Sequence, residues 1–548
     1  MKTKGNALLA QALRAQGVDT LFFIMGGPIN DAATACIGSG IRLIDVRHEQ
    51  AAAMMAQAYA RVRAVPGVCM AASGPGTMNL TTGLANALID CAPVVALGGA
   101  SALNEVGTGS FQEIDQVAVM RPVTKWAERV HEARRIPEYV DKAFRIAMAG
   151  KPGPVFLDLP ADVLYAEVDP AAVVSPRAPE MRVTARAAAS SEGVASLVDL
   201  LKRAERPIML TGSGILWSQA DEALRKLIDA AGIPFYTTPQ GRGVVPEDHR
   251  CFFGHARSKA FKEADLVIVV GTRLNYVFGY GRPPRFSPSA TLVRIDIDPQ
   301  QTATSQHAAL TITAHARVTL TQLHAAVAAE DLPRRYAAWR ETLAQEETKR
   351  KQAFEASIAT NAMPIHPLRL CKEIRDFIGR DTILVVDGQE ILNYGRQTIP
   401  SFRPGHRLNS GPFGTMGVGL PFGVGAKAAR PDRQVVVLHG DGSFGLNAME
   451  LDTAIRHKLP VLVVISLNGG WTADPEQKKP GRFLGYTRFD KVAEALGGHG
   501  EYVEKPEDIR PALERAAKAV ADGKTALVNV VTDWRARSST AAFTTYST

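Results

Sequence analysis

The chain has 548 residues, of which 46% are hydrophobic and 22% are charged. This composition is typical of a globular enzyme and excludes a disordered chain, a collagen-like fibre and a small disulfide scaffold. The net charge of +8 comes from scattered Lys and Arg, without the dense basic and aromatic stretches that bind nucleic acid. We therefore expect no nucleic-acid partner, whereas a modest positive charge suits a phosphorylated or carboxylated small substrate.

Cysteine usage and hydropathy indicate a cytoplasmic protein. The five cysteines are odd in number and show no CxxC spacing, so a disulfide framework or zinc site is not expected and a reducing compartment fits. The N-terminal segment has an amphipathic helical pattern rather than that of a signal peptide. No apolar run reaches the roughly 20 residues that cross a bilayer, so we expect no membrane association.

Short apolar runs alternate with helical patterns almost throughout the chain. The first part shows this at 20–26, 42–46 and 67–72, with a small-residue helix predicted over 49–62. Buried strands separated by helices are typical of parallel α/β layers. Later blocks repeat the pattern, with strands predicted at 264–271 and 292–299 and a long polar helical connector at about 315–358.

The fold class predicted from this alternation is α/β, with three doubly wound parallel-sheet domains and a C-terminal tail. A Pro-, Ala- and Ser-rich linker separates the first two domains, and the first and third domains share a rough pattern of Gly-rich segment, small-residue helix and apolar strand. The expected units are a first domain at 1–170, a middle domain at 190–330, a third domain at 360–534 and a tail at 535–548.

The strongest chemical signal is the sequence GDGSF at 440–444, followed by LNGG at 467–470. An apolar strand precedes each motif, so one βαβ unit places Asp441 and Asn468 at adjacent strand ends, where open parallel sheets bind ligands. Carboxylate, amide and carbonyl oxygens form the shell that Mg²⁺ prefers. Gly440 and Gly442 let the backbone approach the phosphates, and the N-terminus of the crossover helix predicted at 446–458 faces their negative charge. The alternative is a tight strand–helix turn with an Asp cap.

This spacing resembles the motif of thiamine-diphosphate-dependent enzymes, and the resemblance extends over the whole chain. It implies that Asp441, Asn468 and the backbone carbonyl of Gly470 hold Mg²⁺, which in turn holds thiamine diphosphate. It also implies that the first domain binds the pyrimidine ring, that the third binds the diphosphate, and that the middle domain is Rossmann-like. Since the family places its cofactor between subunits, we expect a homodimer or homotetramer.

Glu49 is the second mark of the family. It follows an expected strand and precedes the small apolar residues of the 49–62 helix, so we expect poor solvation to raise the pKa of its carboxyl group. The resemblance assigns to it the hydrogen bond to the aminopyrimidine ring that activates the cofactor. The alternative is a first-turn Glu that complements the helix dipole.

Other cofactor contacts follow from the resemblance alone, each with a structural alternative. Asn79 lies in a Gly-rich segment that lines the pyrimidine side, and it could equally belong to a helix start built on small residues. Met416 would prop the cofactor into its bent shape, although a Met among glycines also fills cores. Gln389 follows a strand near the diphosphate. The full set of expected cofactor contacts is Pro28, Glu49, Asn79, Gln389, Met416, Asp441, Gly442, Ser443, Asn468 and Gly470.

The middle domain favours the acyl-CoA branch of the family, which contains oxalyl-CoA decarboxylase and 2-hydroxyacyl-CoA lyase. The sequence GTRLNY at 271–276 resembles that branch, whereas acetolactate synthases carry an acidic segment there. Asp296 ends a strand and could bind a ribose hydroxyl of an adenine nucleotide such as ADP, or it could be a turn residue.

The expected reaction is cleavage of 2-hydroxyacyl-CoA to formyl-CoA and an aldehyde or ketone. By resemblance, Gln112 and Glu113 of a Phe-Gln-Glu sequence would join Glu49 as catalytic groups, although both could simply be packing residues. Arg257 and Arg396 would contact the phosphates of CoA, and Trp471 would contact the acyl part.

Three alternative functions remain open. They are an oxalyl-CoA decarboxylase, an acetolactate-synthase-like carboligase with FAD, and a non-catalytic nucleotide-binding scaffold. The polar tail at 535–548 has no hydrophobic periodicity, and we expect it to close over bound CoA or to be a frayed terminus.

Overall fold

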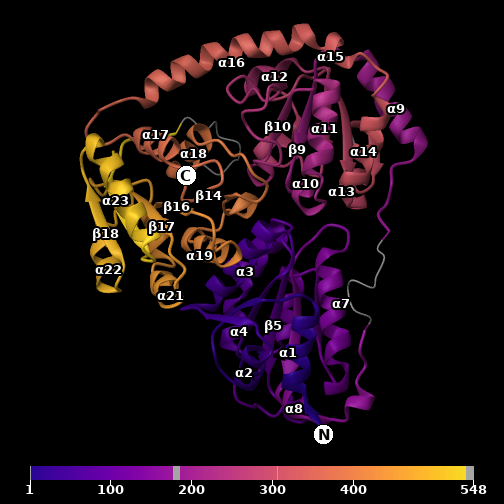
Figure 1. Ribbon diagram of the computed structural model, residues 1–548, viewed down its shortest axis with the longest axis vertical. Helices are drawn as coiled ribbons and strands as arrows, with labels where there is room; N and C mark the ends of the chain where they lie inside the picture. The colour runs from indigo at the N-terminus through magenta and orange to yellow at the C-terminus, as the bar shows by residue number, and fades with distance from the viewer. Residues whose placement is uncertain (1, 177–184, 305–306, 539–548) are drawn as a thin grey trace.

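The computed structural model describes residues 2–176, 185–304 and 307–538. Figure 1 shows three α/β units: the N-terminal one at the bottom, the middle one at the upper right and the C-terminal one at the left. Helix α16 (Ala337–Ile358) runs across the top from the middle to the C-terminal unit. Three parallel sheets confirm the predicted fold class. Of the predicted tail, residues 539–548 lie outside the described residues. No described helix is both long and apolar enough to span a membrane.

The N-terminal sheet has six strands, all paired in parallel. Its four inner strands are largely apolar because helices cover both faces of the sheet. The order is β3 (Arg42–Asp45), β2 (Thr20–Phe23), β4 (Gly67–Ala71), β5 (Val94–Ala100), β7 (Val155–Pro160) and β6 (Trp126–Arg129). The main helices are α1 (Gly5–Ala15), α2 (Asn30–Gly38), α3 (Glu49–Arg63), α5 (Thr81–Ile89) and α7 (Ile136–Met148). A short antiparallel pair, β1 (Thr3–Lys4) with β8 (Glu167–Val168), ties the two ends of this domain together.

The C-terminal sheet repeats the same relative strand order. In both sheets the first strand lies between the second and third, and the sixth lies between the fourth and fifth. The order here is β15 (Arg407–Leu408), β14 (Ile383–Asp387), β16 (Val435–Gly440), β17 (Leu462–Leu467), β19 (Ala526–Val531) and β18 (His499–Val503). Its helices are α17 (Pro367–Phe377), α18 (Glu390–Thr398), α19 (Gly419–Ala429), α20 (Asp441–Gly445), α21 (Glu450–Arg456), α22 (Phe489–Ala495) and α23 (Ile509–Ala521).

The middle sheet has five parallel strands, one of which the sequence pattern did not predict. A fifth strand, β13 (Ala308–Thr313), and helix α14 (Ala316–Ala326) complete it, and Leu320 and Leu323 of that helix are buried in its core. The stretch predicted as a connector at 315–358 therefore begins with a packed helix, and only α16 bridges to the next domain. The order is β10 (Phe235–Thr237), β9 (Pro207–Thr211), β11 (Leu266–Val270), β12 (Thr291–Asp296) and β13.

Helices α3 and α19 join the N- and C-terminal domains through one continuous apolar core. A Cβ atom on Gly425 of α19 would lie 2.3 Å from the Met55 carbonyl oxygen of α3, so the two backbones approach too closely for any side chain there. Helix α3 is buried along almost its whole length, because α19 covers the face that its own sheet does not. This packing explains why α3 is built from small residues.

Candidate functional site

The GDG motif forms a strand–helix turn whose carboxylate is buried. Asp441 is the first residue of α20 and is 4% exposed. Its two carboxylate oxygens accept the N–H groups of Gly442, at 2.8 Å, and Gly469, at 2.7 Å. The second bond connects the turn after β16 to the turn after β17, which pair as parallel neighbours. Asn468 lies at this second strand end, where its side-chain oxygen accepts the Gly470 N–H at 3.2 Å.

These oxygens fit a hard divalent cation. Burial raises the pKa of Asp441 to about 6, against the stabilising effect of the backbone N–H donors. A cation at this carboxylate would favour its charged form. One carboxylate, one amide oxygen and the Gly470 carbonyl give an all-oxygen donor set of the kind that Mg²⁺ prefers. The arrangement can therefore hold a metal ion at the carboxyl edge of the sheet.

The same turn packs against Trp471. A Cβ atom on Gly442 would lie 2.8 Å from the indole ring of Trp471, so the ring covers the backbone at the start of α20. The Ser443 hydroxyl donates to the Gly440 carbonyl at 3.0 Å, and its oxygen lies 3.1 Å from Nδ1 of the buried His439. Trp471, expected to contact an acyl group, is therefore placed over the GDG turn, beside the candidate metal ligands.

The predicted residues Gln389 and Met416 line a large open cavity of about 2140 Å³. The cavity lies where the carboxyl strand ends of the middle domain face α18 and the segment 410–416 of the C-terminal domain. Small-molecule pockets commonly measure about 300–1,000 Å³, so this cavity can hold an extended ligand. The predicted residues Arg257, Asp296 and Arg396 line it as well.

Arg257 is the most unusual cation in the cavity. Its guanidinium lies 5.1 Å from the ring centre of Phe261 and 5.4 Å from that of Phe278. Its Nε and Nη2 are buried without a hydrogen-bond partner among the described residues. Burial and the neighbouring Arg285 lower the pKa of Arg257 to about 10. A buried cation with unused donors is well suited to an anionic ligand group.

Arg396 and Asp296 lie at two other sides of the cavity. Burial, followed by repulsion from Arg242, lowers the pKa of Arg396 to about 10, and its buried Nε has no hydrogen-bond partner in the described ranges. Asp296 ends β12, and its carboxylate accepts the Asp298 N–H at 3.0 Å. Burial raises the pKa of Asp296. The C-terminal segment also reaches this cavity, since Arg537 and Ser538 line it.

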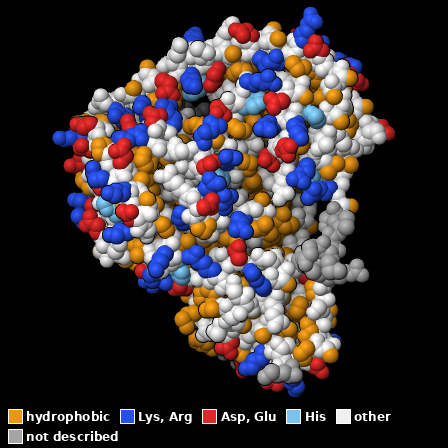
Figure 2. Space-filling view, in the orientation of Figure 1, with side chains coloured by type: hydrophobic (Ala, Val, Ile, Leu, Met, Phe, Trp, Pro, Cys, Tyr) orange, Lys and Arg blue, Asp and Glu red, His pale blue; other side chains and the backbone are white. Residues whose placement is uncertain are grey.

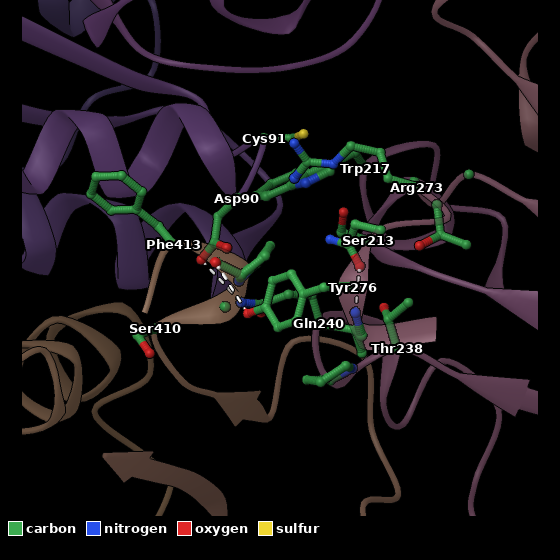
Figure 3. A pocket seen from close by; sticks show the side chains of 18 of the residues that line it. Asp90, Cys91, Ser213, Trp217, Thr238, Gln240, Arg273, Tyr276, Ser410 and Phe413 are labelled. Atoms are coloured by element: carbon green, nitrogen blue, oxygen red, sulfur yellow. Dashed lines mark hydrogen bonds between the residues drawn. The ribbon is translucent and has the colours of Figure 1, made fainter. Parts of the chain in front are cut away.

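The wall of this cavity holds a three-domain junction that sequence reasoning missed. Figure 3 shows Asp90 of the N-terminal domain and Gln240 of the middle domain pointing toward one another, with Ser410 of the C-terminal domain to one side. The Gln240 amide donates to Asp90 at 3.0 Å and to the Asn409 carbonyl at 3.3 Å. Burial raises the pKa of Asp90 to about 7. The junction anchors the segment that carries Met416. The sequence could not reveal this junction, because polar residues between a strand and a turn are too common a pattern.

Glu49 and Asn79 lie together, away from the cavity. Glu49 opens α3 and accepts the Asn79 side-chain N–H at 3.0 Å. Gly76 leaves room for the Glu49 carboxylate, because a Cβ atom on Gly76 would lie only 3.2 Å from it. Glu49 is half-buried and Asn79 is exposed, and neither lines the cavity that Gln389 and Met416 share. Glu49 and Asn79 therefore form a candidate half-site of the N-terminal domain, separate from the candidate half-site of the C-terminal domain.

The other residues predicted on the N-terminal half-site differ in their surroundings. The Gln112 side-chain oxygen accepts the Ser73 hydroxyl at 2.8 Å. Glu113 instead accepts backbone N–H groups of its own loop, at Gly109 and Ser110, both at 3.0 Å. Hydrogen bonds from this loop, chiefly at Gly107, lower the pKa of Glu113. The Glu113 carboxylate thus holds the loop in shape. This arrangement suits a residue that supports the neighbouring Gln112 better than one that transfers protons.

Pro28 completes the predicted set. It is buried in the loop after β2, where a Cβ atom on Gly99 would lie 2.5 Å from its ring. Its carbonyl accepts the Tyr165 hydroxyl at 3.3 Å. The ring therefore fixes the shape of the loop that borders the N-terminal half-site.

Three domain families match the chain, and the relatives agree with them. The N-terminal TPP binding domain, the central domain and the C-terminal TPP binding domain of thiamine pyrophosphate enzymes match residues 3–119, 194–323 and 392–530. Acetolactate synthase large subunit IlvG of Mycobacterium tuberculosis is 36% identical, over 96% of this chain and 95% of the relative.

Two further relatives carry acyl-CoA names. A 2-hydroxyacyl-CoA lyase of Oryza sativa is 33% identical, over 97% of this chain and 96% of the relative. The oxalyl-CoA decarboxylase of Escherichia coli is 30% identical, over 97% of this chain and 95% of the relative. With all three domains matched in order, the chain belongs to the thiamine pyrophosphate (thiamine diphosphate) enzyme family.

Proposed function

We propose that the protein is a thiamine-diphosphate-dependent 2-hydroxyacyl-CoA lyase. The reaction breaks the C1–C2 bond of a 2-hydroxyacyl-CoA and yields formyl-CoA and an aldehyde or ketone; its reversal is a condensation. The observation that carries the proposal is the single cavity running from Asp296 past Arg257 to Gln389 and Met416. The cavity offers guanidinium nitrogens without hydrogen-bond partners in the described part of the chain, suited to phosphate, and it also contains the two residues that we expect to contact the cofactor.

The residues at the GDG turn fit thiamine diphosphate with Mg²⁺. Asp441, Asn468 and the Gly470 carbonyl would hold the metal, and the N-terminus of α20 at Gly442 and Ser443 would face the diphosphate. When bound, thiamine diphosphate supplies the carbon nucleophile and the electron sink for cleavage. Met416 would support the cofactor from the cavity side, and Gln389 would border its diphosphate.

The N-terminal half-site would supply the acid–base groups. Glu49 would hold a proton at its carboxylate against the aminopyrimidine ring, and Asn79 keeps that carboxylate in place by its hydrogen bond. Gln112 would contact the substrate from the loop that Glu113 holds. Pro28 would border the same side. The hydrogen bond from the Ser73 hydroxyl holds the Gln112 side chain in place.

CoA would lie along the cavity. Arg257 and Arg396 would contact its phosphates, and Asp296 would meet the ribose of a nucleotide such as ADP, if the middle domain binds one. The tail would close over bound CoA, since Ser538 donates its N–H to Glu390 at 2.7 Å and accepts from Asn393 at 3.1 Å.

A second copy of the chain would complete the site. Several large apolar side chains near the two half-sites are exposed, and apolar patches of this kind mark interfaces. They include Met25, Phe111, Ile114, Phe413, Leu446, Met449, Phe483 and Leu484. Figure 2 shows that apolar side chains also gather on the flank of the N-terminal domain. A homodimer, or a tetramer made of two, would cover these surfaces.

One coupled assay tests the activity. Purified protein with Mg²⁺ and thiamine diphosphate would be given several 2-hydroxyacyl-CoA thioesters, with formyl-CoA and aldehyde measured together. We expect both products in equal amounts. Oxalyl-CoA in the same assay distinguishes the decarboxylase alternative, because that reaction releases CO₂ and no aldehyde.

Acetolactate synthase is a second candidate because the relative at 36% identity carries that name. Pyruvate consumption with acetolactate formation, and no turnover of acyl-CoA, would replace the lyase proposal. A yellow, flavin-bound protein would favour that reading.

A further inference from the structure

A buried carboxylate of the C-terminal domain holds the backbone that leads into Glu49. Glu450, the first residue of α21, is 1% exposed. One of its oxygens accepts the N–H of Arg47 at 3.1 Å and that of His48 at 3.2 Å. Its other oxygen accepts the Thr453 hydroxyl at 2.6 Å. The two residues held are those immediately before Glu49.

Several other contacts besides this carboxylate hold the two domains together. Arg47 pairs with Asp452 at 2.6 Å, and Asp45 pairs with Arg456 at 2.6 Å and His457 at 2.7 Å. These pairs are partly solvent-exposed, and the packing of α3 on α19 already joins the domains. Glu450 alone is buried, and burial raises its pKa to about 7. A buried carboxyl group is costly unless it is hydrogen-bonded, and two of the hydrogen bonds that Glu450 accepts come from the backbone before Glu49.

The geometry of these hydrogen bonds indicates what Glu450 does. Two successive backbone N–H groups bound by one oxygen fix the direction in which the chain enters α3, and hence the direction in which the Glu49 side chain leaves it. His48 adds to this by capping the helix, since its Nδ1 accepts the Gln50 N–H at 3.1 Å. On the other side, Glu49 is held only by Asn79 among the hydrogen bonds of its side chain to described residues.

We infer that Glu450 is a positioning residue for Glu49, acting through the backbone of Arg47 and His48. The inference rests on the proposed role of Glu49. Glu450 also lies nine residues after Asp441, on the segment that carries the candidate metal ligand. If Glu49 serves a second copy of the chain, Glu450 connects the metal turn of one site to the acid–base group of the other.

The test compares four variants as holoenzymes. Glu450→Ala removes the acceptor, Glu450→Gln keeps one acceptor oxygen, and Asp452→Asn removes a neighbouring ion pair on the same helix. Glu49→Gln is the reference. For each we would measure kcat, KM for acyl-CoA, the affinity for thiamine diphosphate, the thermal midpoint, and the rate at which the cofactor's C2 proton exchanges with deuterium. That exchange reports cofactor activation independently of substrate.

We expect Glu450→Ala to lower kcat and the exchange rate together, by about 10- to 100-fold as for a misplaced catalytic group. KM and cofactor affinity should stay within about twofold, because the metal turn and the cavity are unchanged. Glu450→Gln should recover most of the exchange rate, and Asp452→Asn should match the parent.

Parental exchange in a folded Glu450→Ala protein would overturn the inference, and so would an equal loss in Asp452→Asn. If Glu450→Ala does not fold, Thr453→Val takes its place, since it removes only the hydroxyl that steadies the carboxylate; parental exchange there, together with parental exchange in Glu450→Gln, would also overturn it. Normal exchange in Glu49→Gln would instead refute the proposed role of Glu49 itself.

Discussion

The N- and C-terminal domains share one strand order, yet they present opposite kinds of half-site. In the C-terminal domain, Asp441 is buried and tied by backbone N–H groups to the next strand end. In the N-terminal domain, Asn79 is exposed and Phe111 is 86% exposed. The same topology thus yields a buried turn that could hold a metal ion and, in the other domain, an outward-facing surface to which we assign the acid–base role. The difference teaches that the strand order sets where ligands bind, whereas the residues after each strand, and what covers them, set the chemistry.

The largest effect should come from the outward-facing half. Glu49→Ala should lower turnover by about 10²–10⁴-fold, the usual contribution of an acid–base group. Its side chain makes one described hydrogen bond, to Asn79, so the fold should survive. Steady-state kinetics at saturating cofactor measures the loss, with the thermal midpoint as control. Activity above about a tenth of the parent would remove Glu49 from the site.

A substitution at the buried Asp441 should affect cofactor binding rather than turnover alone. Asp441→Ala should weaken Mg²⁺-dependent binding of thiamine diphosphate by more than about 100-fold, since even indirect supports of metal ligands contribute 10–100-fold. Calorimetric titration with and without Mg²⁺ measures this affinity. Glu49→Ala is the matched control, because it should bind the cofactor with nearly parental affinity. An unchanged affinity in Asp441→Ala would mean that the turn is only structural.

Mixing the two variants tests whether Glu49 of one chain and Asp441 of another chain belong to the same active site. Co-expressed Glu49→Ala and Asp441→Ala chains should form heterodimers in which one of two sites has both residues intact. Random pairing then predicts recovery of about a quarter of the parental specific activity. Each variant alone is the control. No recovery, from a mixture shown by differently tagged chains to contain heterodimers, would place both halves in one chain.

The smallest effect concerns the three-domain junction. Gly411 has a φ of +63°, and a Cβ atom there would lie 1.8 Å from the Asp90 carboxylate. Gly411→Ala should therefore cost about 1–3 kcal/mol from overpacking, in addition to the strain of a left-handed backbone. Gly414 has a φ of +75° with open space around it, so Gly414→Ala pays the backbone strain alone. Denaturant unfolding of both variants separates the two contributions. Equal losses in the free energy of unfolding would show that the junction adjusts to the added methyl group and that overpacking costs little.

The sequence by itself determined the α/β class, the alternation of strands and helices, and the GDG and Asn-Gly-Gly turns. Parallel strands end at a common edge, so local patterns were enough to predict that Asp441 and Asn468 would lie side by side. The small residues of α3 were visible too. The reason for them was not, because it lies in α19, more than 350 positions along the chain.

Only the tertiary structure decided what each side chain faces. It placed Trp471 over Gly442, joined Asp90 to Gln240, and placed Glu450 beside the backbone that leads into Glu49. Such contacts depend on distances between segments that are remote in sequence. Local propensity and motif spacing carry no information about those distances, because the packing of whole domains fixes them.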